Sequence, residues 1–273
     1  ANGQDMWWRI IRFNGDGSAR MIYEGVGAAG SNTYTQKPVP RNRWNRALDA
    51  KYVGWMYGGA SGSASTSKDQ AQRNETDSDL KIAVDAWYKT NIVDTGFHNY
   101  VADAIFCNDR SISNEIGTGL GYGKNYTVFG GYIRLDALNT PNYKNPQPQF
   151  TCPQDNDKFT VSTTSGGNGT LTYPIGLITV DEMVTAGAGL SNKTNGTFYL
   201  YRYEDRYENM YWSFTPFNSS EDDTTMFILD SLGYISWEYV QTPKEIYPVI
   251  NLKSEYLNQF KGMGTISNPY SLR

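Results

Sequence analysis

Two runs of hydrophobic residues separated by a polar turn predict a β-hairpin in the N-terminal part of the chain. Aromatic and β-branched residues dominate segments 7–13 and 19–24, and two turn dipeptides, Asn14-Gly15 and Asp16-Gly17, stand between them. Turn dipeptides of this kind between strand-forming runs are the strongest short-range signal for a hairpin. We therefore expect two antiparallel strands here.

One longer segment has helical periodicity. Within residues 76–91, Leu80, Val84 and Trp87 recur at the spacing of one helix face. Charged residues lie off this stripe: Asp77, Lys81 and Lys89. Thr76 or Asp77 is expected to accept the free amides of the first turn. The pattern predicts an amphipathic helix with Trp87 in the core.

A second, shorter helix is predicted by a capping box. Thr179 and Glu182 are three residues apart, so each side chain can satisfy a free amide at the start of a helix. The residues expected to face the core are Val180, Met183 and Val184, and Gly187 is expected to end the helix. Acidic residues in a first turn complement the helix dipole, so Asp181 and Glu182 are assigned a structural role rather than acid–base catalysis.

Short strands dominate the C-terminal part of the chain. Strand-forming runs occur at 198–203, 210–215, 225–229, 234–237 and 247–252, without an intervening helix. Residues 230–233 have the composition of a hairpin turn. These runs predict a small antiparallel sheet and disfavour a doubly wound parallel one. Residues 108–170 are rich in Gly, Asn, Pro and Thr and are expected to form long ordered loops.

Composition narrows the class of protein. The 273 residues are long enough to bury a large core, and a single domain over 1–273 is expected, with parts at 1–106, 107–172 and 173–273. A net charge of −4 disfavours binding to nucleic acid. Only 19% of residues are charged, whereas 14% are aromatic, a balance typical of an extracellular, β-rich chain. No apolar run is long enough to span a membrane, so membrane association is expected only through a segment absent from this chain.

Histidine and cysteine counts exclude several kinds of site. His98 is the single histidine, so a site with two histidine ligands is excluded, and we expect His98 to be structural or at the surface. Cys107 and Cys152 are not part of a CxxC motif, which disfavours zinc binding. An even pair fits one disulfide, with two buried thiols as the alternative.

Several motifs together resemble a known family. They lie at 173–182, 211–216, 247–254 and 264–270, with further similarity at 7–18 and 106–111. In this order they resemble bacterial surface domains related to the formylglycine-generating-enzyme type of the C-type-lectin fold, in chains where the domain often follows a prepilin-like membrane helix. The resemblance implies an α+β, C-type-lectin-like fold with small antiparallel sheets, two or three short helices and long ordered loops.

That fold family contains enzymes as well as binding proteins, so function has to be argued from the site. Its enzymes resemble one another in C-terminal active-site cysteines or in several iron-binding histidines. The present chain has no cysteine after Cys152 and one histidine. We therefore expect a non-enzymatic, extracellular domain for ligand binding or adhesion. Its expected partner is a protein or glycan on another surface, as in receptor-binding proteins diversified by retroelements.

The composition of residues 199–241 favours a binding face there, because this segment holds 7 of the 21 tyrosines. Tyr offers a large contact area at low entropic cost, and Arg and Asn add adaptable hydrogen bonds. The predicted ligand-binding residues are Tyr201, Tyr203, Asp205, Arg206, Tyr207, Asn209, Tyr211, Trp212, Asn218, Glu221, Asp222, Trp237 and Tyr239. Alternation along a strand leaves a second reading open, in which half of the tyrosines pack inside the sheet.

Three alternatives remain. The first concerns cofactors: none is expected, although the acidic run 221–223 beside Asn218 could hold calcium. The second is a structural subunit of a pilin-like or other surface filament that self-assembles. The third is a carbohydrate-active enzyme with a carboxylate pair such as Asp205 with Glu221 or Asp222.

Overall fold

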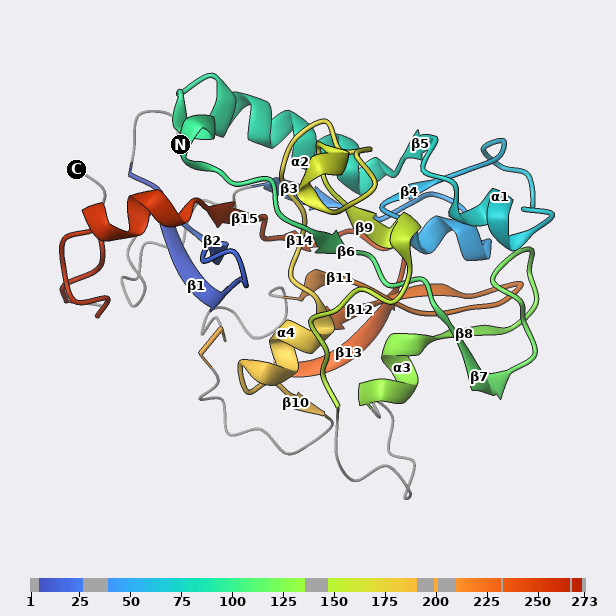
Figure 1. Ribbon diagram of the computed structural model, residues 1–273. Coiled ribbons are helices and arrows are strands. Elements are labelled where there is room, and N and C mark those ends of the chain that lie inside the picture. The colour runs from blue at the N-terminus through green and yellow to red at the C-terminus, as the bar shows by residue number, and fades with distance from the viewer. Residues whose placement is uncertain are drawn as a thin grey trace.

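The predicted N-terminal hairpin is confirmed by the computed structural model, which describes residues 5–26, 39–135, 147–190, 199–200, 210–231, 233–265 and 267–271. Strand β1 (Trp7–Phe13) pairs antiparallel with β2 (Ala19–Gly25). The turn between them is closed by the Asn14 amide, which donates to the Ser18 carbonyl. On its other side β2 pairs with β15 (Val249–Leu252), so the N-terminal and C-terminal parts of the chain share one small sheet (Figure 1).

A larger sheet forms the centre of the molecule. Its hydrogen-bonded path in the described residues is β10 (Gly189–Leu190), β13 (Tyr234–Tyr239), β12 (Thr224–Leu229), β11 (Tyr211–Ser219), β14 (Lys244–Ile246) and β3 (Val39–Asn42). Strand β8 (Thr127–Phe129) also pairs with β11, and β7 (Ile112–Gly117) with β8. The β11–β12–β13 meander is antiparallel as predicted, but β10 pairs with β13 and β11 with β14 in parallel. The sheet is therefore mixed.

The predicted hairpin turn between β12 and β13 is also confirmed. The Asp230 carbonyl accepts a hydrogen bond from the Gly233 amide, and its carboxylate accepts one from the Tyr234 amide. Gly233 has a φ of 83°, a conformation that favours glycine. Two smaller pairs complete the strands: β4 (Met56–Tyr57) with β5 (Thr76–Asp77), and β6 (Phe106–Cys107) with β9 (Lys158–Phe159).

Helix α2 (Asp79–Tyr88) corresponds to the predicted amphipathic helix, with two corrections. It begins later than predicted, because Thr76 and Asp77 belong to β5 and Ser78 is the residue whose side chain caps the first turn. Lys81 is fully buried rather than on a solvent face. Its ammonium bonds Asp77 at the end of β5 and Asp85 one turn further along the helix, and these carboxylates supply the counter-charges that burial requires.

The capping box at α4 (Val180–Thr185) is present as predicted. The Glu182 amide donates to the Thr179 hydroxyl, and the Thr179 amide donates to the Glu182 carboxylate. The remaining α-helices are α1 (Lys68–Gln72) and α3 (Gly130–Leu135). Short 3-10 and π segments are η1 (Ala50–Val53), η2 (Lys89–Val93), η3 (Phe97–Tyr100), η4 (Asp155–Asp157), η5 (Thr163–Ser165) and η6 (Ser254–Gln259). The described residues thus contain four short α-helices, where two or three were expected.

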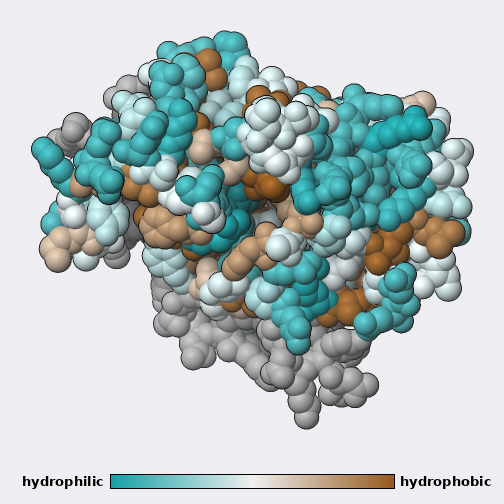
Figure 2. Space-filling model, in the orientation of Figure 1, coloured by the Kyte–Doolittle hydropathy of each residue, from teal (hydrophilic) through white to brown (hydrophobic). Residues whose placement is uncertain are grey.

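One contiguous core joins the three parts of the chain. It runs from Ala19 in β2 to Leu252 in β15. Its centre is aromatic: Trp44 packs on Trp55, and both contact Phe214 of β11. Most of the surface visible in Figure 2 is polar, and hydrophobic residues are exposed there only in small separate areas. The fold is therefore α+β, with small sheets and few helices.

The middle part, 107–172, is less irregular than the predicted long loops, since it contains β7, β8, α3 and β9. The predicted disulfide is present between Cys107 and Cys152, with 5.5 Å between the Cα atoms. Among the described residues, every helix is too short or too polar to cross a membrane.

Candidate functional site

Six of the predicted ligand-binding residues lie outside the described residues. They are Tyr201, Tyr203, Asp205, Arg206, Tyr207 and Asn209. Their role stays a prediction.

Two other predicted binding residues are buried, so their prediction was wrong. Tyr211 and Trp212 are each 1% exposed. Tyr211 packs on Tyr247, whereas Trp212 packs on Trp44 and donates from its indole nitrogen to the Asn42 carbonyl at 2.9 Å. Both side chains are buried because β11 is covered on both faces, and a strand in that position has no solvent side to offer a ligand.

The remaining predicted residues lie on β11, on β13 and at the tip of the β11–β12 hairpin. Trp237 and Tyr239 are 37% and 36% exposed, two residues apart on the same face of the strand. The indole of Trp237 stacks almost parallel on the buried ring of Phe217, with 5.9 Å between centroids and 11° between planes. Tyr239 stands edge-on to Trp237, with 5.6 Å between centroids. Phe217 in turn contacts Tyr132 of α3, so the exposed indole rests on a packed aromatic base.

Polar groups surround these two rings. Asn218 accepts a hydrogen bond from the Thr225 hydroxyl at 2.8 Å, and Thr225 lies directly opposite Tyr239 in the neighbouring strand. Asp223 hydrogen-bonds Tyr239. The negative charge of Asp223 raises the pKa of Tyr239. Asn218, Tyr239 and Asp223 thus form one polar row beside Trp237.

The tip of the β11–β12 hairpin lies at the end of this row. The Ser220 amide donates to the Asp223 carbonyl, which closes the turn and leaves Glu221 and Asp222 exposed. Glu221 lies 3.7 Å from the Lys124 ammonium, and both side chains are more than half exposed. Within the described part of the chain, no three His, Cys, Asp or Glu side chains are grouped closely enough to hold a metal ion.

We call this arrangement the β13 platform. Its members are Asn218, Glu221, Asp222, Asp223, Trp237 and Tyr239. It combines a rigidly supported aromatic face with carboxylate and amide groups at its border. Such a surface can stack against an apolar face of a ligand and accept hydrogen bonds from the ligand's hydroxyl or amide groups.

A pocket beside the disulfide was not predicted from the sequence. Its volume is about 640 Å³, within the range of small-molecule sites. Its walls come from the β1–β2 hairpin, segment 103–109, α3, segment 149–152, β9, η5, the start of α4 and Thr215 of β11. It opens near the middle of the face in Figure 2, where teal and brown residues meet around a recess. We call it the disulfide pocket.

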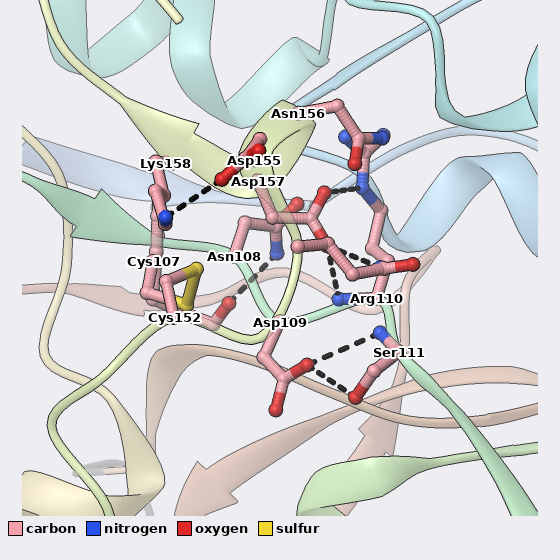
Figure 3. The surroundings of a disulfide bond; sticks show 12 residues. Cys107, Asn108, Asp109, Arg110, Ser111, Cys152, Asp155, Asn156, Asp157 and Lys158 are labelled. Carbon is pink, nitrogen blue, oxygen red and sulfur yellow. Dashed lines mark hydrogen bonds and ion pairs between the residues drawn. A yellow bond between two sulfur atoms is a disulfide. The ribbon is translucent and has the colours of Figure 1, made fainter. Parts of the chain in front are cut away.

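Figure 3 shows how the chain is anchored beside this pocket. Asp109 and Arg110 point in different directions. The Asp109 carboxylate accepts hydrogen bonds from Ser111, whereas the Arg110 side chain extends away from Asp109 and donates to Asp157. The Arg110–Asp157 pair is buried, with 2.6 Å between Nε and Oδ1. Together with the disulfide it holds segment 152–158 against β6.

Sequence reasoning could not have predicted the disulfide pocket, because segments far apart in the chain contribute to it. Asp181 and Glu182 were identified only as first-turn acids, and they do serve the helix. The same two carboxylates also line the pocket and bind arginines from distant segments. His98, by contrast, is exposed in η3, in agreement with a surface position.

Comparisons with protein-family models, with curated proteins and with solved structures find no match to this chain.

Proposed function

We propose that this chain is a non-enzymatic, extracellular ligand-binding domain of C-type-lectin-like fold that holds a protein or glycan on another surface. The observation that supports this best is the β13 platform, where an exposed Trp237 ring is backed by the buried Phe217 ring and bordered by acids and an amide. Aromatic rings fixed in this way lose little entropy on binding.

Three further observations agree with the proposal. The α+β architecture with small sheets is compatible with the C-type-lectin-like fold. The disulfide suits an oxidising compartment outside the cytosol. The sole histidine is exposed in a short 3-10 turn and is not a member of the platform.

The platform also explains why a glycan is the ligand class to test first. The indole offers a flat apolar face, and the side chains of Asn218, Glu221 and Asp222 offer acceptors for hydroxyl groups at its edge. A protein ligand would use the same surface with Trp237 as its central contact.

The test compares Trp237→Ala with Tyr270→Ala, a control aromatic residue that is 49% exposed on a different segment. Each purified variant is screened against glycan and host-surface protein arrays, with and without calcium, beside light scattering. Because aromatic hot spots typically contribute about 2 kcal/mol or more, Trp237→Ala should weaken binding about 30-fold or more. Tyr270→Ala should bind as the parent does.

Two outcomes would overturn the proposal. One is a folded Trp237→Ala variant that binds its ligand as tightly as the parent. The other is the absence of any ligand together with concentration-dependent assembly, which would favour the filament-subunit function.

A further inference from the structure

The disulfide pocket contains two ion clusters of opposite net charge. In the first, Glu182 binds two guanidinium groups: its Oε1 atom lies 2.9 Å from Arg12 Nε and 2.5 Å from Arg20 Nε. One carboxylate thus faces two cations, so the cluster carries a net charge of +1. We call it the Glu182 cluster.

Arg20 is the buried cation of the Glu182 cluster. Arg20 is 1% exposed, and its Nη1 atom has no hydrogen-bond partner within the described residues. The Arg20 guanidinium lies over the Phe106 ring, 4.5 Å from the centroid. Burial lowers the pKa of Arg20, while Glu182 opposes that effect. Because Nη1 of Arg20 is itself buried, Arg20 contributes positive charge to the cluster from below the cavity surface. Arg12, whose side chain is 24% exposed, is the donor that a ligand in the cavity can reach.

The second cluster has the opposite balance. Arg134 donates from Nε and Nη2 to Asp181 at 2.8 and 2.9 Å, and from Nη1 to Asp109 at 3.0 Å. One guanidinium thus faces two carboxylates, each no more than 5% exposed at the side chain, for a net charge of −1. We call it the Arg134 cluster. On both carboxylates Oδ1 already accepts two hydrogen bonds, from Ser111 on Asp109 and from Arg134 and the Gln149 amide on Asp181. Oδ2 of each accepts one, from Arg134, and so keeps capacity for a cationic donor.

The two clusters are held side by side. Asp181 and Glu182 are neighbours in the first turn of α4, and this turn is fixed by the capping box and by the Val180 amide, which donates to the Thr215 hydroxyl at 3.1 Å. A positive and a negative cluster therefore line one cavity of about 640 Å³. In a partly buried site, charges are screened less than at the open surface.

We propose that the disulfide pocket binds a small zwitterion of the α-amino-acid class. The Glu182 cluster receives the ligand carboxylate, with Arg12 as the donor and the buried Arg20 adding positive charge. The Arg134 cluster receives the ligand ammonium, with Asp109 and Asp181 as acceptors. The volume leaves room for a side chain or for a short peptide, whose two termini carry the same pair of charges. This site is separate from the β13 platform, and zwitterion binding does not depend on a ligand at the platform.

The probes are single free amino acids, then Gly-Gly and tri-alanine, titrated into the intact, oxidised chain and followed by calorimetry and thermal shift. Matched derivatives with one charge removed, the N-acetyl amino acid and the amino-acid amide, test each cluster separately. We expect saturable binding of at least one zwitterion and a loss of tenfold or more for each capped derivative. Comparison of free amino acids with the peptides distinguishes the two sources of the ligand.

Variants assign the binding to the pocket. Arg12→Gln and Asp109→Asn should each weaken binding tenfold or more, whereas Arg73→Gln, which removes a cation that is 61% exposed at its side chain elsewhere, should not. Trp237→Ala should also leave zwitterion binding unchanged, which separates this proposal from the function of the platform. Thermal unfolding of each variant without ligand shows whether it folds. If Arg12→Gln or Asp109→Asn does not fold, the binding measurement on the other variant decides.

Three results would overturn the proposal. The first is no saturable binding of any zwitterion at millimolar concentration. The second is an N-acetyl or amide derivative that binds as well as the parent amino acid, since one of the two clusters would then contribute nothing to binding. The third is binding that folded Arg12→Gln and Asp109→Asn variants retain in full.

Discussion

Replacing Glu182 by Gln should destabilise the fold strongly. Glu182 has two roles, as a helix cap and as a counter-ion, and this substitution removes only the second. As a capping residue it accepts from the Thr179 amide at 3.0 Å, and Gln can do the same in a capping box. As a counter-ion it faces Arg12 and the fully buried Arg20, which Gln cannot neutralise. Glu182→Gln therefore removes the charge and keeps the cap.

The two roles contribute differently to the free energy of unfolding. Loss of one partner from a buried ion pair costs about 3–5 kcal/mol. Loss of a helix cap costs about 1 kcal/mol. Glu182→Gln should therefore reduce the free energy of unfolding several times more than Thr179→Ala, which removes the hydroxyl that caps α4. Urea unfolding at pH 7, with a shared m-value, measures both.

The pH dependence provides a second check. Burial alone would raise the pKa of Glu182, but the charges of Arg20 and Arg12 and the hydrogen bond from Thr179 outweigh it, so this pKa lies below its ordinary value. An acid with a depressed pKa in the folded state stabilises the fold above its unfolded pKa, about 4.3, and loses that contribution as the pH falls through the folded pKa. The stability gap between parent and Glu182→Gln should thus be constant above about pH 5 and narrow below it.

The reasoning would be refuted by a Glu182→Gln variant that loses no more stability than Thr179→Ala. A gap that widened on acidification would contradict the assigned direction of the pKa. The combined variant Glu182→Gln with Arg20→Met serves as the control, because it removes the buried Arg20 cation together with the Glu182 charge. It should recover part of the lost stability if the unpaired guanidinium is the cause.

The remaining predictions concern stability elsewhere in the fold. Removing the disulfide by Cys107→Ala with Cys152→Ala should cost about 4 kcal/mol for a separation of 45 residues, as measured by guanidinium unfolding against the oxidised parent. Lys81→Met should cost about 2 kcal/mol or more in urea unfolding, because Asp85 would lose the cation 2.7 Å from its carboxylate; equal stability of the two proteins would contradict this. His98→Gln should change stability by less than about 0.5 kcal/mol in thermal unfolding, since His98 is exposed, and a larger loss would show an unrecognised structural contact.

Elements set by local chemistry could be predicted from the sequence. The N-terminal hairpin follows from its turn dipeptides, and the α4 cap follows from Thr179 and Glu182 alone, because all the interacting groups lie within a few residues. The ion pair of Lys81 with Asp85 was within reach of the same reasoning, but its burial was not, because spacing does not show which face of a helix is covered. Asp85 stands four residues after Lys81, which is the spacing of a helical ion pair, whereas Asp77 lies before the helix, in β5.

Properties that depend on tertiary contacts could not be predicted in this way. Tyr211 and Trp212 have the composition of a binding face, yet β11 is the central strand and is covered on both sides. Alternation marks a surface only when one face of a strand is solvated. Trp237 and Tyr239 have the same residue types, but they are exposed because β13 has a solvated face.

Strand β11 relates the two candidate sites to each other. Thr215 faces α4 and lines the disulfide pocket, whereas Phe217, two residues later, supports the β13 platform. Pro216 lies between them, at a point where the register with β12 shifts on both sides. Proline cannot donate to the ladder, and such an irregularity bends a strand and redirects its side chains.

The two sites therefore share one buried strand but no lining side chain. A close-packed strand of this kind positions both sites without itself needing to move when either ligand binds. Substitutions at the exposed edge of the platform, such as Trp237→Ala, should accordingly leave the pocket intact, and substitutions of Arg12 should leave the platform intact. A change at Thr215 or Phe217, by contrast, should alter the shared support and affect both sites together.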